Sequence, residues 1–167
     1  MRSIRRSSIL SAIVIVVILA AVPGAIVRII QTGDPYLFTE RFFADMLARL
    51  SGPGRFRFIL QPTMAVLLGA RDGIKDAGAE LPPFLWSLVF HHGQRSELLR
   101  GALLSVRNVV ALAILLDIIS QFLIFREIHP GAALILGPVL IGMPYTLARA
   151  FSNRISRWRK SRQVRPG

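Results

Sequence analysis

The chain has 167 residues, of which 53% are hydrophobic, and its 21 Lys and Arg against 9 Asp and Glu give a formal net charge of +12. The hydrophobic residues form long blocks with almost no charge, which is typical of a membrane protein and excludes a soluble domain with a large core of its own. The basic excess is then best explained by the positive-inside bias and by anionic headgroups rather than by nucleic acid, and the absence of cysteine excludes disulfides and zinc-thiolate sites.

The first predicted element is a membrane span over residues 9–30, preceded by a basic N-terminus without acids. Its 22 residues carry one charge, Arg28, close enough to the end of the span to snorkel. The run is too long for a typical signal peptide, and residues 21–25 make a poor cleavage site, so we predict an uncleaved anchor. Ala20 and Gly24, four residues apart, give this helix a small face for packing.

Two shorter elements follow. Residues 39–50 predict an amphipathic helix in the plane of the periplasmic interface, with lipid docking as its ordinary use and partner binding as the alternative. As a helix, residues 55–70 would measure only about 24 Å. A standard membrane crossing needs about 20 residues, which measure about 30 Å. The basic N-terminus and the basic tail at 150–167 should both be cytoplasmic, which requires an even number of crossings. We therefore expect 55–70 to be the fourth span, with a re-entrant segment as the alternative.

The rest of the chain predicts a cytoplasmic loop at 71–107, a span at 108–125 and, after a tight turn, a span at 131–149. The expected fold is a single all-α membrane domain with four transmembrane helices and one short interfacial helix. Further small residues for helix packing are Ala65, Gly69, Ala133 and Gly137. Basic residues of the tail expected to contact anionic lipids are Arg154, Arg157, Arg159 and Lys160.

Asp117 lies at the middle of its predicted span, where a carboxylate costs about 2.5–3.5 kcal/mol on insertion scales. Ser120 and Gln121 share its helix face, so this stripe should face protein or water rather than lipid. One interpretation is a hydrogen bond to Gln61, Thr63 or a partner subunit. The other is a proton or ion relay, or a contact to a quinone-like ligand. Because the spans hold no second acid, we favour the structural interpretation.

The segment Asp72-Gly73-x-x-Asp76 resembles the opening of the metal-binding motif of phosphatidyl-alcohol transferases. That motif continues with Ala-Arg and a second pair of aspartates, whereas this chain has Asp76-Ala77 and no further aspartate before Asp117. A salt-bridged helix surface is therefore the better interpretation, and we predict no enzyme activity. The pair His91-His92 and the pair Glu127 and His129 are expected on opposite sides of the membrane, so no metal site is predicted, and no cofactor is implied.

Four segments resemble a group of small uncharacterised bacterial integral membrane proteins over residues 55–149: Phe58-x-Leu60-Gln61-Pro62, Leu68-Gly69-x-Arg71-Asp72-Gly73, Pro83-Phe84-Leu85-Trp86 and Glu97-Leu98-Leu99-Arg100. The resemblance implies a location in the bacterial inner membrane. That group has no assigned activity, so it implies no catalytic or binding residue in this chain.

The function that the sequence favours is a non-enzymatic accessory or scaffold subunit of a bacterial inner-membrane complex, an energy-converting complex being one such host. Its expected partners are other integral membrane subunits and anionic lipids, without nucleic acid. The alternative is a small ion- or solute-translocating oligomer that uses the intramembrane pair Asp117 and Gln121.

Overall fold

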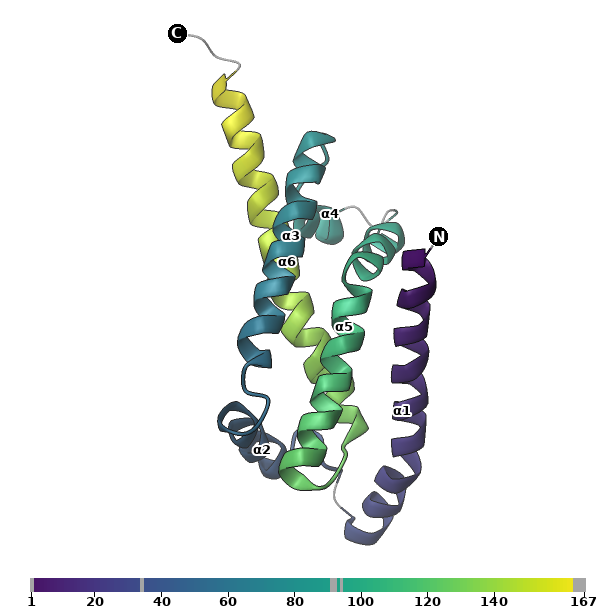
Figure 1. Ribbon diagram of the computed structural model, residues 1–167. Coiled ribbons are helices and arrows are strands. Elements are labelled where there is room, and N and C mark those ends of the chain that lie inside the picture. The colour runs from purple at the N-terminus through teal and green to yellow at the C-terminus, as the bar shows by residue number, and fades with distance from the viewer. Residues whose placement is uncertain (1, 34, 91–92, 94, 164–167) are drawn as a thin grey trace. The chain divides into compact units, whose positions relative to one another are not determined.

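A computed structural model describes residues 2–33, 35–90, 93 and 95–163, and in that part of the chain it contains helices and no strand (Figure 1). The protein is therefore all-α, as predicted. The helices are α1 (Arg2–Thr32), α2 (Glu40–Ser51), α3 (Arg57–Gly78), α4 (Phe84–Phe90), α5 (Arg95–Phe125) and α6 (Pro130–Gln163).

Among the described residues, three helices are long and apolar enough to cross a membrane: Ile9–Thr32 within α1, Arg95–Phe125, and Pro130–Arg162 within α6. This is consistent with a multi-pass membrane protein. Helix α3 is not one of the three, because its C-terminal turns carry several charged residues.

Several predicted boundaries differ from the structure: α5 begins at Arg95, inside the predicted loop 71–107, and two helices end later than predicted. Helix α3 continues to Gly78 rather than ending near residue 70, so Asp72 and Asp76 lie on a helix, which is the interpretation favoured above for this pair, although the segment was placed in the loop 71–107. Helix α6 continues to Gln163, through most of the segment predicted as a tail. In both cases packing extends the helix: Gly73 and Ala77 of α3 are buried, and so is Asn153 of α6. Basic residues in the last turn of α6 also stabilise a helix C-terminus.

The chain divides into two compact units, and each is described by itself. Unit 1 comprises Met1–Leu60 and Arg107–Leu140, and unit 2 comprises Gln61–Val106 and Ile141–Gly167. Three helices, α3, α5 and α6, contribute residues to both units.

In unit 1, α1 runs alongside residues 107–125 of α5 (Figure 1). Val14 of α1 packs in one apolar cluster with Ile114 and Ile118 of α5 and Ala133 of α6. The close approach of α5 and α6 depends on Gly137, because a Cβ at that position would lie 2.8 Å from Cγ1 of Ile114.

Local capping fixes the turns of unit 1. Thr39 caps α2, since its side chain accepts a hydrogen bond from the Phe42 N–H at 3.3 Å. Helix α5 ends at Phe125, and the next residue, Arg126, has a left-handed φ of 57° and donates its N–H to the Phe122 carbonyl at 3.0 Å. The turn to α6 is therefore only residues 126–129, which brings His129 next to the start of α6.

In unit 2, small residues at every fourth position of α3 face α6. They are Ala65, Gly69, Gly73 and Ala77, and all four are buried. A Cβ on Gly69 would lie 2.3 Å from the carbonyl oxygen of Tyr145, and one on Gly73 would lie 2.2 Å from that of Arg149. The two backbones can approach this closely only because both positions are glycine.

Helix α4 is one short element held by its neighbours. The Arg95 side chain donates to the carbonyls of Leu88 at 2.7 Å and Val89 at 2.6 Å, which satisfies C-terminal carbonyls of α4. The loop before α4 is held to α6 because the Asn153 amide donates to the Leu81 carbonyl at 3.1 Å. These contacts place α4 against the C-terminal half of α6.

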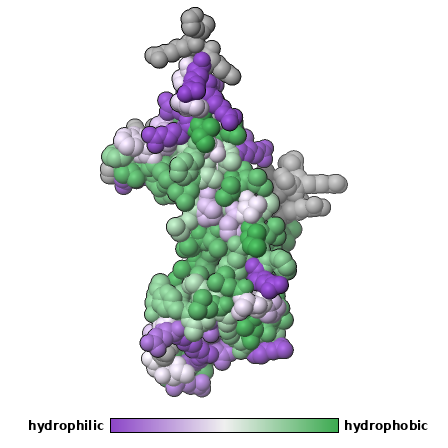
Figure 2. Space-filling view, turned by 90° about the vertical axis from the view of Figure 1, so that its left-hand side faces the viewer, coloured by the Kyte–Doolittle hydropathy of each residue, from purple (hydrophilic) through white to green (hydrophobic). Residues whose placement is uncertain are grey.

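Much of the surface is apolar. Figure 2 shows hydrophobic residues over a large part of the face presented there. In α1, large aliphatic side chains such as Val16 and Leu19 are more than half exposed. Monomeric soluble proteins rarely expose such surfaces, so this exposure is consistent with a multi-pass membrane protein.

Candidate functional site

The most unusual feature of unit 1 is a buried ion pair. Nη2 of Arg57, in the first turn of α3, lies 2.6 Å from Oδ1 of Asp117 in α5. The two side chains are 5% and 3% exposed. A buried charge is tolerated only when it is paired and hydrogen-bonded, and each member here supplies the other's counter-charge.

Gln121 links this pair to the turn between α5 and α6. Its Nε2 donates to Oδ2 of Asp117 at 2.7 Å, and its Oε1 accepts from the His129 backbone N–H at 2.6 Å. Both carboxylate oxygens of Asp117 are thus engaged inside the unit. Ser120 is also buried, and its Oγ lies against Gly54, where a Cβ would be 2.5 Å away.

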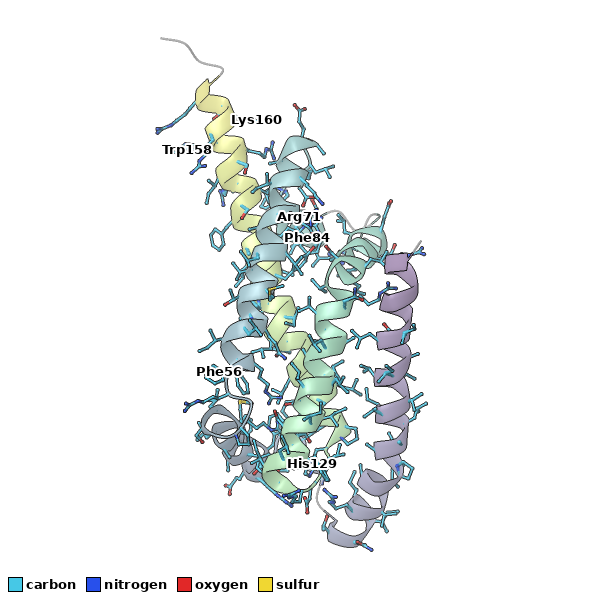
Figure 3. The ribbon with its side chains drawn as sticks, viewed as in Figure 1. Phe56, Arg71, Phe84, His129, Trp158 and Lys160 are labelled. Carbon is cyan, nitrogen blue, oxygen red and sulfur yellow. The ribbon has the colours of Figure 1, made fainter. Side chains whose placement is uncertain are left out.

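Beyond Gln121, polar residues gather at the turn that holds His129 (Figure 3). The His129 ring stacks on Tyr36, with 3.5 Å between centroids and 22° between planes. Arg28 donates to Glu127 at 2.9 Å and lies 3.3 Å from Nε2 of His129, while Arg41 donates to Glu127 at 2.9 Å. Arg28 was expected only to snorkel toward the membrane interface. Instead, it contacts Glu127 and His129 and so stabilises this turn.

Two groups in this cluster are electrostatically perturbed. Burial, together with the charge of Arg28, lowers the pKa of His129 to about 4, so the ring is neutral at pH 7. Nε2 then accepts from Arg28. Burial and the hydrogen bond that its hydroxyl donates to Asp45 at 2.8 Å raise the pKa of Tyr36 above its usual value. Neither group is therefore poised to exchange a proton near neutral pH.

Unit 2 holds a second polar centre on α3, where two carboxylates lie one turn apart. Asp72 accepts hydrogen bonds from the Tyr145 hydroxyl at 2.8 Å and from the Ser105 hydroxyl. Asp76 forms a bidentate pair with Arg149 of α6, at 2.7 Å from Nε and 3.0 Å from Nη2.

Arg149 also connects the parts of this centre. Its Nη1 donates to the Tyr145 hydroxyl at 3.1 Å, and its guanidinium lies 4.5 Å from the centre of the Phe84 ring. Because their oxygens face α6, Asp72 and Asp76 are used for helix packing, and the described residues contain no cluster of three or more side chains suited to hold a metal.

The sequence-predicted residues fall into three groups. Asp117, Ser120 and Gln121 lie together in unit 1, while Gln61 is buried in unit 2. The packing residues Ala65, Gly69, Ala133 and Gly137 are buried, whereas Ala20 is exposed and Gly24 has nothing of the described chain within 4 Å of a Cβ. The basic residues Arg154, Arg157, Arg159 and Lys160 are exposed on α6, and His91 and His92 lie outside the described residues.

Two contacts were not predicted from the sequence. The first is the ion pair itself, because Arg57 was not proposed as the partner of Asp117, yet it is buried and pairs with that carboxylate. The second is the contact of Tyr145, which is 1% exposed and donates its hydroxyl to Asp72. A signal for the second contact was present: Asp72 and Asp76 share one spacing with Tyr145 and Arg149, as two facing helices require.

No family model, no curated protein and no solved structure matches the chain. The assignment of function therefore depends on the geometry described above.

Proposed function

We propose that the protein is a non-enzymatic accessory or scaffold subunit of a bacterial inner-membrane complex, with four transmembrane helices and both termini in the cytoplasm. The observation that carries the proposal is the closure of Asp117: one oxygen pairs with Arg57 and the other accepts from Gln121. A carboxylate used in this way holds helices together. It offers no free oxygen to a substrate or an ion.

The exposed surface supports the same role. Helix α1 buries Val14 in the apolar cluster of unit 1, but its large aliphatic side chains on other faces are exposed. The small face at Ala20 and Gly24 is exposed as well. Small residues four apart allow a second helix to approach closely. A helix of a larger partner subunit would fit this face of α1.

The fourth crossing is assigned to α3. Its 22 residues would measure about 33 Å, and the charge at its start is neutralised by Asp117. On this topology α2 lies at the periplasmic interface, where Phe43 and Leu47, both exposed, would contact lipid.

The absence of cysteine allows a direct test of this topology. Single cysteines are introduced at Phe56, the residue before α3, and at Gly78, the last residue of α3. They should react with a membrane-impermeant maleimide from opposite sides of the membrane. Both residues are exposed, so accessibility within the chain does not limit the reaction. Labelling of both from the same side would refute the fourth crossing.

The accessory role is tested by extraction of an affinity-tagged chain in a mild detergent. The expected result is a stoichiometric partner, which is lost in Gly24→Leu but retained in the control Ile15→Phe, because Ile15 is exposed on the opposite face of α1 and only the first change fills the small face. Recovery of the wild-type chain as a lone monomer in several mild detergents would overturn the proposal.

A second candidate is a small ion- or solute-translocating oligomer. It is favoured by one observation, a continuous hydrogen-bonded path from Asp117 through Gln121 to the His129 turn. If this function holds, Asp117→Asn should abolish flux in proteoliposomes while assembly persists. The double variant Arg57→Met with Asp117→Leu should do the same, since it removes the carboxylate without leaving an unpaired charge. Unchanged flux in both would exclude Asp117 from transport.

A further inference from the structure

Unit 2 contains an open groove of about 630 Å³ between the segment 82–86 and one face of α6. Its volume lies within the range of about 300–1,000 Å³ that is usual for small-molecule sites. Pro82, Pro83, Leu85 and Trp86 form one wall. The groove is independent of the buried polar centre, because Asp72, Asp76 and Tyr145 do not line it.

The other wall is a single stripe along α6. Leu147, Ala150, Phe151, Arg154 and Arg157 line it, at the spacing that places residues on one helix face. The stripe changes from apolar to basic along the helix, over about 15 Å from Leu147 to Arg157. An amphiphile with an apolar tail and an anionic head has the same order of properties.

The two arginines are available for a ligand. Both are exposed, and neither forms an ion pair or hydrogen bond with a described residue. The groove lining contains no acid that would neutralise them. By contrast, Arg149 of the same helix is fully engaged with Asp76 and Tyr145.

The aromatic residue of the groove points to the same kind of ligand. Trp86 is 56% exposed, although its ring also packs against Phe90 with 4.1 Å between centroids. Tryptophan concentrates at the headgroup level of membranes, where an apolar ring meets a polar layer. The C-terminal turns of α6, which carry Trp158 and Lys160 in Figure 3, are mostly hydrophilic in Figure 2, as expected for a helix leaving the hydrocarbon.

We propose that this groove binds one anionic phospholipid, with an acyl chain along Leu147 and Phe151 and the phosphate between Arg154 and Arg157. Arginine donates paired hydrogen bonds to phosphate oxygens, and basic pockets beside cytoplasmic helix ends are suited to anionic headgroups. The proposal requires a membrane location but does not require the accessory role. The lipid site and the accessory role can therefore be refuted independently of each other.

The test uses the intrinsic fluorescence of Trp86. The chain has two tryptophans, so Trp158→Phe leaves Trp86 as the only one. This protein is placed in phosphatidylcholine nanodiscs, and phosphatidylglycerol with brominated acyl chains, which quench tryptophan on contact, is added in increasing mole fraction. Saturable quenching at a low mole fraction is expected, and brominated phosphatidylcholine at the same fraction should quench far less.

Matched variants separate the groove from general attraction to the basic helix end. Arg154→Gln with Arg157→Gln should raise the half-saturating mole fraction about tenfold. The control Arg159→Gln with Lys160→Gln removes the same charge outside the groove and should change it less than about threefold. Ala150→Leu, which fills the groove without changing charge, should weaken binding as strongly as the first pair.

Equal effects of the two charge pairs would show diffuse attraction to the membrane surface and overturn the site. Equal quenching by the two brominated lipids would also overturn it, and this comparison uses the unsubstituted groove, so it stands even if a variant fails to fold. As a second readout, native mass spectrometry of the detergent-extracted protein should show one retained phosphatidylglycerol, and its complete absence would count against the proposal.

Discussion

Breaking the buried ion pair should destabilise the protein strongly and in a non-additive way. Arg57 and Asp117 lie 2.6 Å apart with at most 5% of either side chain exposed, so solvent cannot replace a missing partner. Removing one member of such a pair typically costs about 3–5 kcal/mol, whereas replacing both with apolar residues is often neutral. We therefore expect Arg57→Met and Asp117→Leu each to be destabilising, and the double variant to recover most of that loss, remaining below wild-type stability by the cost of the Gln121 donor that Asp117 no longer accepts from.

The two single variants should also differ from each other. In Asp117→Leu the guanidinium stays charged and Gln121 loses the acceptor of its Nε2, which adds the cost of an unsatisfied buried donor, about 1–3 kcal/mol. In Arg57→Met the carboxylate keeps the hydrogen bond that Gln121 donates. Asp117→Leu should therefore be the more destabilising change.

The measurement is a double-mutant cycle on reversible unfolding in detergent micelles, followed by circular dichroism. A coupling energy of at least about 2 kcal/mol is expected for the pair. The exposed pair Arg41 and Glu127 is the control and should couple by at most about 1 kcal/mol. Effects of Arg57→Met and Asp117→Leu that add within 0.5 kcal/mol would refute the reasoning, because independent sites behave in that way.

Three further predictions concern single residues. Gly73→Ala places a Cβ 2.2 Å from the Arg149 carbonyl oxygen and should cost about 1–3 kcal/mol in the same unfolding assay. The control Gly78→Ala, whose Cβ meets nothing within 4 Å, should be close to neutral. Equal effects of the two variants would contradict the close contact between α3 and α6. Arg149→Lys should lose about 1–2 kcal/mol, because an ammonium cannot form the bidentate pair with Asp76, and wild-type stability would show that this geometry is unimportant. His129 has a pKa of about 4 in the folded protein and 6.5 in the unfolded chain, so between these pH values only the unfolded chain binds the extra proton. The free energy of unfolding should therefore fall by roughly 2–3 kcal/mol as the pH drops from 7 to 4. His129→Gln should flatten this part of the pH profile, and an unchanged profile would assign the acid sensitivity to another group.

The sequence predicted elements better than contacts. The apolar runs and the short turn at 126–129 identified α1, α5 and α6, because hydrophobic length depends only on local composition. Thr39 and the apolar periodicity after it identified α2. The ends of α3 and α6 were missed, because buried glycines and Asn153 extend these helices through contacts with distant segments.

The candidate site shows the same division. Asp117 and Gln121 were identified as a polar stripe from their spacing on one helix. Their ionic partner was not, because an arginine at the start of an apolar segment can either snorkel or be buried. Arg57 is buried because α3 begins beside α5, a fact about the arrangement in space.

The amino-acid sequence alone determined that this is a helical protein of apolar blocks with a basic excess, since chain composition and periodicity suffice for that. Only the tertiary structure decided which charges are neutralised and which stay open. Asp117 and Asp76 have their arginines, while Arg154 and Arg157 line a groove without an acid. The physical reason is that ion pairing depends on distances of a few ångströms between residues as many as 99 positions apart, which no local pattern encodes.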